Sequence, residues 1–171
     1  MTFIDKLRSS PKMMLLVVSF ALFVDYYIYG MVAPLASVSP AHIEDESIIS
    51  TLYGGYAMGL IVATPILGII TDRIGRRKPM LIGIVLLAIS TLLFGFGTSK
   101  EMLLAARVLE GAAAACTWTA ALALCAEYFV ENRVQAMGIA MLGGTTGSVA
   151  GPLIGGKLFD MGGYAAPFYV A

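Results

Sequence analysis

The sequence has few charged residues and almost none of the groups that bind metals or form disulfides. Only 13% of its 171 residues are charged, it has one histidine, and its two cysteines are Cys116 and Cys125. Nine residues of helix would separate the two thiols by about 13 Å, too far for a disulfide. The formal net charge is zero, so the charge balance gives no sign of a nucleic-acid partner. We therefore expect no metal site, no disulfide and no nucleic-acid partner.

Long apolar runs take the place of these groups. Hydrophobic residues make up 58% of the chain, well above the share in ordinary soluble domains. A transmembrane barrel would need alternating apolar and polar residues, whereas the runs here are unbroken. A helix needs about 20 apolar residues to cross a bilayer. The sequence therefore predicts an all-α integral membrane protein with room for five or six spans.

The apolar runs give the positions of these spans. We expect them at residues 13–35, 48–71, 79–97, 102–130 and 136–158, with the start of a sixth at 165–171. The first run is longer than the apolar core of a signal peptide and contains Asp25 and Pro34, so we expect it to be a retained span. The short loops favour a bundle in which helices adjacent in the sequence are neighbours in space.

Lysine and arginine are distributed unevenly between alternate loops. One set of segments carries Lys6, Arg8, Lys12, Arg73, Arg76, Arg77, Lys78 and Arg133, and the other set carries only Lys100 and Lys157. Cytoplasmic loops are enriched in these residues. We therefore expect a multi-pass protein of the cell membrane, inner or plasma, with its amino terminus in the cytoplasm.

The loop after the second span, GIITDRIGRRKPM at residues 68–80, has a specific residue order. Its basic residues alone would indicate only a cytoplasmic loop, while Gly68 permits close helix approach and Gly75 a tight turn. The order resembles the signature loop between helices two and three of the major facilitator superfamily, matched at Gly68, Asp72, Arg73, Gly75, Arg76 and Arg77. The resemblance implies a conformational latch in which Asp72 and Arg76 join a charge network, with part of the partner surface in the other half of a transporter.

Two charged residues, Arg107 and Glu110, lie inside the fourth span. They are expected about 8 Å and 12 Å below the membrane edge, a depth at which charges are costly unless paired or facing water. Thr117 continues their helical face. One interpretation is a structural ion pair between Arg107 and Glu110; the other is a functional site. The order R-x-x-E-G resembles the fourth-helix motif of the same superfamily, which implies a role for Arg107 in proton coupling.

The first span contains an acid, Asp25, about 18 Å from its cytoplasmic end. A carboxylate at this depth is either protonated or paired with a cation. Tyr29 follows on the same face and Tyr26 flanks it, so ring faces could hold an organic cation beside the acid. The alternative is a fixed structural pairing of Asp25 with Arg107. The arrangement is similar to that of drug:proton antiporters and vesicular amine transporters of the superfamily, which implies a shared substrate or proton site.

The fifth span is unusually rich in glycine. Gly147, Gly151 and Gly155 recur at every fourth position and form a smooth face, and Pro152 is expected to bend the helix. The spacing resembles the helix-five antiporter motif of the superfamily at Gly138, Gly147, Gly151, Pro152, Gly155 and Gly156, which implies an exporter that exchanges substrate for protons. We expect the helix that packs on this face to lie outside the chain.

These features together predict the N-terminal six-helix half of a major-facilitator fold, with helix six truncated and the C-terminal half absent. The resemblance implies proton-coupled efflux of drugs or small amphiphilic molecules by alternating access, driven by a proton gradient without a cofactor. The expected partners are membrane lipid, a small-molecule substrate, and a missing C-terminal half or second half-size chain. The alternatives are a proton symporter of metabolites or sugars and a non-transporting half-size subunit. An enzyme is not expected, because no grouping of nucleophile, base and orienting residue is present.

Overall fold

A computed structural model describes residues 10–36, 46–164 and 166–170. They form the helices α2 (Pro11–Ala36), α3 (Glu46–Ile74), α4 (Arg77–Gly95), α5 (Lys100–Tyr128), α6 (Arg133–Gly162) and the short α7 (Ala166–Val170). No strand occurs within these ranges, and the all-α class is confirmed. Two of the basic residues that indicate orientation, Lys6 and Arg8, lie outside the described residues. So do residues 165 and 171, the two ends of the expected sixth span.

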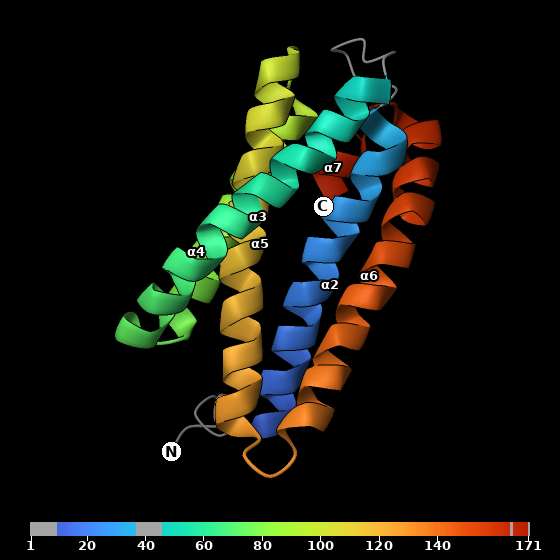
Figure 1. Cartoon of the computed structure of the whole chain (residues 1–171). Helices are drawn as coiled ribbons and strands as arrows, with labels where there is room; N and C mark the ends of the chain where they lie inside the picture. The colour runs from blue at the N-terminus through green and yellow to red at the C-terminus, as the bar shows by residue number, and fades with distance from the viewer. Residues whose placement is uncertain (1–9, 37–45, 165, 171) are drawn as a thin grey trace.

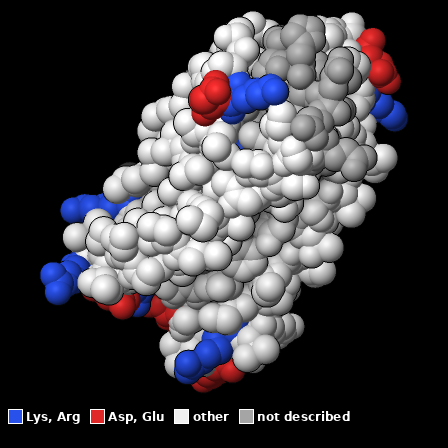
Figure 2. Space-filling view, turned by 45° about the horizontal axis from the view of Figure 1, so that its top comes forward, with Lys and Arg blue, Asp and Glu red and all other residues white. Residues whose placement is uncertain are grey.

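Five of these helices, α2 to α6, are long and apolar enough to cross a membrane. Large apolar side chains point outward from them: Phe20 is 63% exposed, Ile61 67% and Leu81 64%. The space-filling view shows charged side chains toward the ends of the bundle and an uncharged band between them (Figure 2). This surface fits hydrocarbon rather than water, so the prediction of a multi-pass membrane protein is confirmed.

The helices pack in two groups rather than in sequence order. Helix α2 lies along α6, whereas α3 and α4 both pack on α5 (Figure 1). The expectation that helices adjacent in the sequence are neighbours is therefore wrong for the backbones of α2 and α3, which approach each other little although tyrosine rings of the two helices touch. Helix α3 packs far more on α5 than on α4. Short loops bring only the helix ends together, and small side chains further along decide which helices approach closely.

Glycines set the crossing of α3 over α5. A Cβ added at Gly59 would overlap the carbonyl group of Val108, and one added at Gly111 would overlap that of Tyr56. The two backbones are thus in direct contact, and no larger residue fits at either position. This contact fixes which face of α3 is turned toward the centre of the bundle.

The glycine face of α6 packs on α2. Added Cβ atoms at Gly143, Gly147 and Gly151 would overlap the backbone carbonyls of Ser19, Phe23 and Tyr27, respectively, and one at Gly155 would meet the side chain of Met31. The expectation that the partner helix lies outside the chain is therefore wrong. The spacing of the glycines predicts a contact face, but it does not say which helix covers that face.

Three other positions of the glycine-rich pattern behave differently. An added Cβ at Gly138 or Gly156 would meet nothing within 4 Å. Pro152 lies inside the continuous helix α6, and its ring Cδ would be 3.1 Å from a Cβ at Gly30 of α2. Gly138 and Gly156 therefore take no part in the contact between α2 and α6.

Candidate functional site

Three charged residues lie together in the core of the bundle. Asp25 of α2 is 2% exposed, and Arg107 and Glu110 of α5 are 0% and 2% exposed. Nη1 of Arg107 donates a hydrogen bond to Oε2 of Glu110 at 2.5 Å. The ion pair between Arg107 and Glu110 is therefore present, and it offsets part of the cost of burying both charges.

Asp25 is not the partner of Arg107. Neither carboxylate oxygen of Asp25 has a hydrogen-bond donor among the described residues. Arg107 and Glu110 both lie near enough to interact with it electrostatically. A buried carboxylate without a donor is costly, so it must bind a proton or be offset by a cation. Asp25 is thus a buried carboxyl group with no hydrogen-bond donor among the described residues.

Three tyrosines surround the guanidinium group of Arg107. Its Cζ atom lies 5.2 Å from the ring centre of Tyr29, 5.5 Å from that of Tyr53 and 5.0 Å from that of Tyr56. Nε and Nη2 of Arg107 have no hydrogen-bond partner among the described residues, so ring faces take the place of acceptors on this side. We call these three rings the tyrosine cage.

Two members of the tyrosine cage, Tyr53 and Tyr56, were not predicted from the sequence. They lie on α3, within the stretch YGGY at residues 53–56. The available signal was the pair of aromatic residues three positions apart, next to glycines that allow close packing. Gly111, the last residue of the R-x-x-E-G pattern, admits the backbone of Tyr56 and so brings its ring to Arg107.

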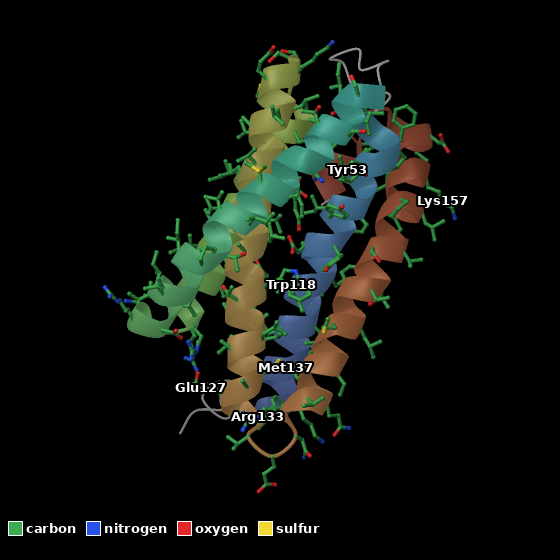
Figure 3. All side chains as sticks on the ribbon, viewed as in Figure 1. Tyr53, Trp118, Glu127, Arg133, Met137 and Lys157 are labelled. Carbon is green, nitrogen blue, oxygen red and sulfur yellow. The ribbon has the colours of Figure 1, made fainter. Side chains whose placement is uncertain are left out.

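An aromatic cavity of 380 Å³ lies beside the tyrosine cage. It is lined by Tyr26, Tyr29, Tyr56, Leu60 and Trp118. The ring centres of Tyr26 and Trp118 are 5.7 Å apart, and those of Tyr29 and Tyr56 are 4.7 Å apart. Figure 3 shows Trp118 between α5 and α2. Tyr53 lies toward one end of the bundle and Glu127 toward the other. The structure thus places Tyr26 and Tyr29, the two expected cavity residues of α2, in one wall.

Thr117 was expected in this cavity, and the structure places it elsewhere. Its hydroxyl donates to the carbonyl of Ala113 at 3.1 Å. Its side chain faces α4, where a Cβ added at Gly83 would lie 2.9 Å from its Oγ1. The residue that does line the cavity is the next one, Trp118, because α4 covers the face on which Thr117 lies.

The loop between α3 and α4 forms ion pairs within the chain. Nη1 of Arg76 lies 2.5 Å from Oδ1 of Asp72, and Nε of Arg76 lies 3.6 Å from Oε2 of Glu127 at the end of α5. The hydrogen bond to Asp72 raises the pKa of Arg76 above its ordinary value. Gly75 has φ +84°, a conformation that side chains rarely adopt, and it reverses the chain between the two helices. This loop is therefore joined to α5 through Glu127, a partner that the sequence did not identify.

Other loop residues have different surroundings. Nη2 of Arg77 donates to the hydroxyl of Tyr128 at 3.0 Å. Arg73 is exposed and has no ion pair with any described residue. A Cβ added at Gly68 would meet nothing within 4 Å, so the close helix approach expected there does not occur within the described part of the chain.

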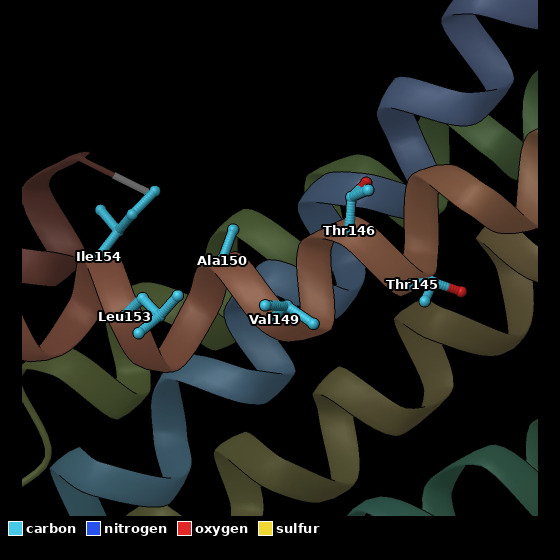
Figure 4. A pocket seen from close by; sticks show the side chains of 6 residues that line it. All are labelled: Thr145, Thr146, Val149, Ala150, Leu153 and Ile154. Carbon is cyan, nitrogen blue, oxygen red and sulfur yellow. The ribbon is translucent and has the colours of Figure 1, made fainter.

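The outer face of α6, away from its glycines, carries a shallow hollow. It is lined by Thr145, Thr146, Val149, Ala150, Leu153 and Ile154 (Figure 4). The hydroxyls of Thr145 and Thr146 donate to carbonyls of α6 itself, those of Met141 and Leu142. The face is therefore apolar in character, and it adds no chemical group to the site.

Comparison with known proteins places the chain in a family. A sequence profile described as "Major Facilitator Superfamily" matches residues 15–171. An uncharacterized MFS-type transporter of Schizosaccharomyces pombe is 35% identical over 96% of this chain and 39% of its own length. The probable vesicular acetylcholine transporter-B of Danio rerio is 31% identical over 93% of this chain and 34% of its own length. The synaptic vesicular amine transporter of Mus musculus is 36% identical over 71% of this chain and 24% of its own length. The chain thus spans at most two fifths of these relatives, and it belongs to the Major Facilitator Superfamily.

Proposed function

We propose that this chain supplies the N-terminal transmembrane half of a proton-coupled antiporter that moves small organic cations by alternating access. The observation that carries the proposal is the buried carboxyl group of Asp25, which has no donor among the described residues and lies on the same helix as the cavity residues Tyr26 and Tyr29. Transporters of this kind bind substrate between two halves, so the substrate path would lie between this chain and a second half, or a second half-size chain.

The chemistry of the cavity favours an ammonium group as the part of the substrate that is recognised. Ring faces attract cations, and a nearby carboxylate adds opposite charge. Two of the relatives named above carry "acetylcholine" or "amine" in their names, which supports amines as the first candidates. Drug efflux remains a second candidate because many amphiphilic drugs share this chemistry. A symporter of sugars is less well supported, since a sugar requires several hydrogen-bonding groups and the lining here is mostly aromatic.

In this proposal Asp25 binds either a proton or a cation, because it would gain little from binding both together. A proton that enters from one side releases the substrate, and a substrate that enters from the other side releases the proton. The energy would come from the proton gradient, without a cofactor. The ion pairs of Asp72, Arg76 and Glu127 would act as a latch at one end of the bundle.

The distribution of lysine and arginine supports a cytoplasmic amino terminus. In that orientation the latch residues Asp72 and Arg76 face the cytoplasm. The membrane would be the cell membrane or that of a vesicle, and membrane lipid would cover the apolar outer surface.

Proton release on cation binding tests this proposal directly. The purified chain in detergent micelles, in weak buffer with a pH dye, is titrated with tetraphenylphosphonium. We expect release of about one proton per bound cation at a pH where Asp25 is protonated, and none from Asp25→Asn. Glu127→Gln, which changes a carboxylate at the end of α5, serves as the matched control and should release protons as the unchanged chain does. Equal release from Asp25→Asn and the unchanged chain would exclude Asp25 as the exchanging group.

A further inference from the structure

Arg107 lies close to the aromatic cavity but does not line it. Its side chain is fully buried, and it is not among the residues that border the cavity. Tyr29 and Tyr56 belong both to the cavity wall and to the tyrosine cage. Their rings therefore separate the positive charge of Arg107 from the space in which a substrate would bind.

Tyr53 forms the third side of the cage and has a different relation to the cavity. Its ring contacts the guanidinium of Arg107 and the ring of Tyr29, whose centre is 5.7 Å away at an interplanar angle of 70°. Tyr53 does not line the cavity. Any effect of its side chain on a bound molecule must therefore pass through Arg107 or Tyr29.

The guanidinium group has a second carboxylate available in the same core. Nε and Nη2 of Arg107 have no acceptor, and both oxygens of Asp25 have no donor, among the described residues. Buried groups of opposite charge that lack partners gain free energy by pairing. Within the cage, contact with three ring faces and one hydrogen bond to Glu110 holds Arg107 in place instead.

We propose that Tyr53 is a positioning residue: it holds Arg107 on Glu110 and away from Asp25, and it thereby makes the cavity selective for cations over anions. The inference rests on the proposed cation site and adds the residue that sets its charge preference. Without the ring of Tyr53, Arg107 can turn to Asp25, neutralise it and bring positive charge to the cavity.

Trp118 provides the measurement. It is the one tryptophan of the sequence and it lines the cavity, so its fluorescence reports binding there. The probes are tetraphenylphosphonium and tetraphenylborate, which have nearly the same size and shape but opposite charge. Each is titrated into the purified chain in micelles, with Trp118→Phe to identify the part of the signal that comes from Trp118. The unchanged chain should bind the cation more tightly than the anion.

The variants at position 53 distinguish the effect of an aromatic ring from the effect of side-chain size. We expect Tyr53→Leu to weaken binding of the cation about tenfold and to strengthen binding of the anion. The reason is that Arg107 loses its contact with the ring face of Tyr53 and can then pair with Asp25. Tyr53→Phe retains the ring face and should stay within about threefold of the unchanged chain for both probes. Tyr53→Met, which is also large and lacks a ring, should behave as Tyr53→Leu does. If Tyr53→Leu does not fold, Tyr53→Met is measured in its place. Tyr169→Leu, at an exposed tyrosine of α7, is the control for loss of a tyrosine elsewhere.

The outcomes distinguish failure of this inference from failure of the proposed cation site. Equal weakening of both probes in Tyr53→Leu would indicate a general structural defect and overturn the positioning role, as would failure of Tyr53→Phe to restore binding. An unchanged ratio of cation to anion affinity in Tyr53→Leu and Tyr53→Met would overturn this inference alone. No binding of either ion by the unchanged chain would overturn the proposed cation site and this inference with it.

Discussion

Gly147 of α6 lies directly against the backbone carbonyl of Phe23 of α2, so closely that a single added methyl group would overlap it. The contact repeats one turn in each direction, at Gly143 with Ser19 and at Gly151 with Tyr27. Helices in a membrane associate largely through such close packing of small residues, because burial of apolar surface gains little there. The helix that carries Asp25 is thus attached to α6 by its backbone.

This contact predicts the effect of adding one methyl group to the glycine face. Gly147→Ala should destabilise the chain by roughly 1–3 kcal/mol, because the two helices must move apart. The measurement is the loss of helical circular dichroism when dodecyl sulfate is titrated into dodecyl maltoside micelles. Gly156→Ala is the matched control on the same helix, since its added Cβ has open space. It should be neutral or slightly stabilising, because alanine favours helix by about 1 kcal/mol over glycine. Equal effects of the two changes would contradict the packing described here.

The buried ion pair predicts a strong asymmetry between single and double substitutions. Arg107→Gln should destabilise the chain by roughly 3–5 kcal/mol, because Glu110 is left buried without its partner, and Glu110→Gln should have a similar effect. The double variant should be markedly more stable than the sum of the single effects implies. Unfolding midpoints of the four proteins in the same detergent titration check this. Simple additivity would mean that Arg107 and Glu110 do not depend on each other.

Substitution of Asp25 should not lower the stability of the chain, in contrast to substitution of Arg107 or Glu110. Its carboxyl group has no donor among the described residues, so Asp25→Asn removes a costly group without breaking a contact. We expect the free energy of unfolding to stay the same or to rise, while the proton release described above is lost. Glu110→Gln, measured beside it, should lower the stability. A loss of more than about 2 kcal/mol in Asp25→Asn would indicate that the carboxylate has a structural partner.

The pair of Arg76 and Glu127 predicts a weak interaction that depends on salt. A double-mutant cycle with Arg76→Gln and Glu127→Gln should give a coupling of about 0.2–1 kcal/mol in low salt and less at 0.5 M salt, because both side chains are partly exposed. The cycle with Arg73→Gln in place of Arg76→Gln should give no coupling. Strong coupling that salt does not change would show that the pair is more buried than it is in this structure.

The pH dependence of that coupling follows from the raised pKa of Arg76. A group whose pKa is higher in the folded state stabilises the fold below its unfolded pKa, and the contribution is lost as the pH rises through the folded pKa. An arginine side chain is not deprotonated in proteins at ordinary pH. The contribution of Arg76 should therefore stay constant between about pH 6 and 9 in the same unfolding measurement.

The sequence predicted the class of fold and the charged residues of the site better than it predicted how the helices pack. Long apolar runs require membrane spans, and charges such as Arg107 and Glu110 within them are rare enough to be informative. The partner of the glycine face could not be predicted, because glycine spacing is a property of one helix and packing belongs to two. Thr117 was placed wrongly for the same reason: helical periodicity put it on the face of Glu110, but α4 covers it.

The tyrosines of α3 show a second limit of the sequence. Tyr53 and Tyr56 lie in an apolar run in which any face could point to lipid, and no charge in that part of the run marks the inner side. The rotation of α3 is set by contacts of Gly59 and Gly111 with the opposite backbone, which form only when α5 is in place. A residue whose role depends on such a contact cannot be identified from its own segment.

The crossing of α3 over α5 also determines how α3 can move. Gly59 lies at the crossing, with Tyr53 about 9 Å along the helix on one side and Asp72 about 20 Å on the other. If α3 tilts as a rigid rod about this point, its two ends move in opposite directions, and the end with Asp72 moves about twice as far as Tyr53. A tilt that moved Asp72 at one end of α3 would therefore also displace Tyr53, a ring of the tyrosine cage, from Arg107. A single helix, α3, thus runs from the charge in the core to the ion pairs at the end of the bundle.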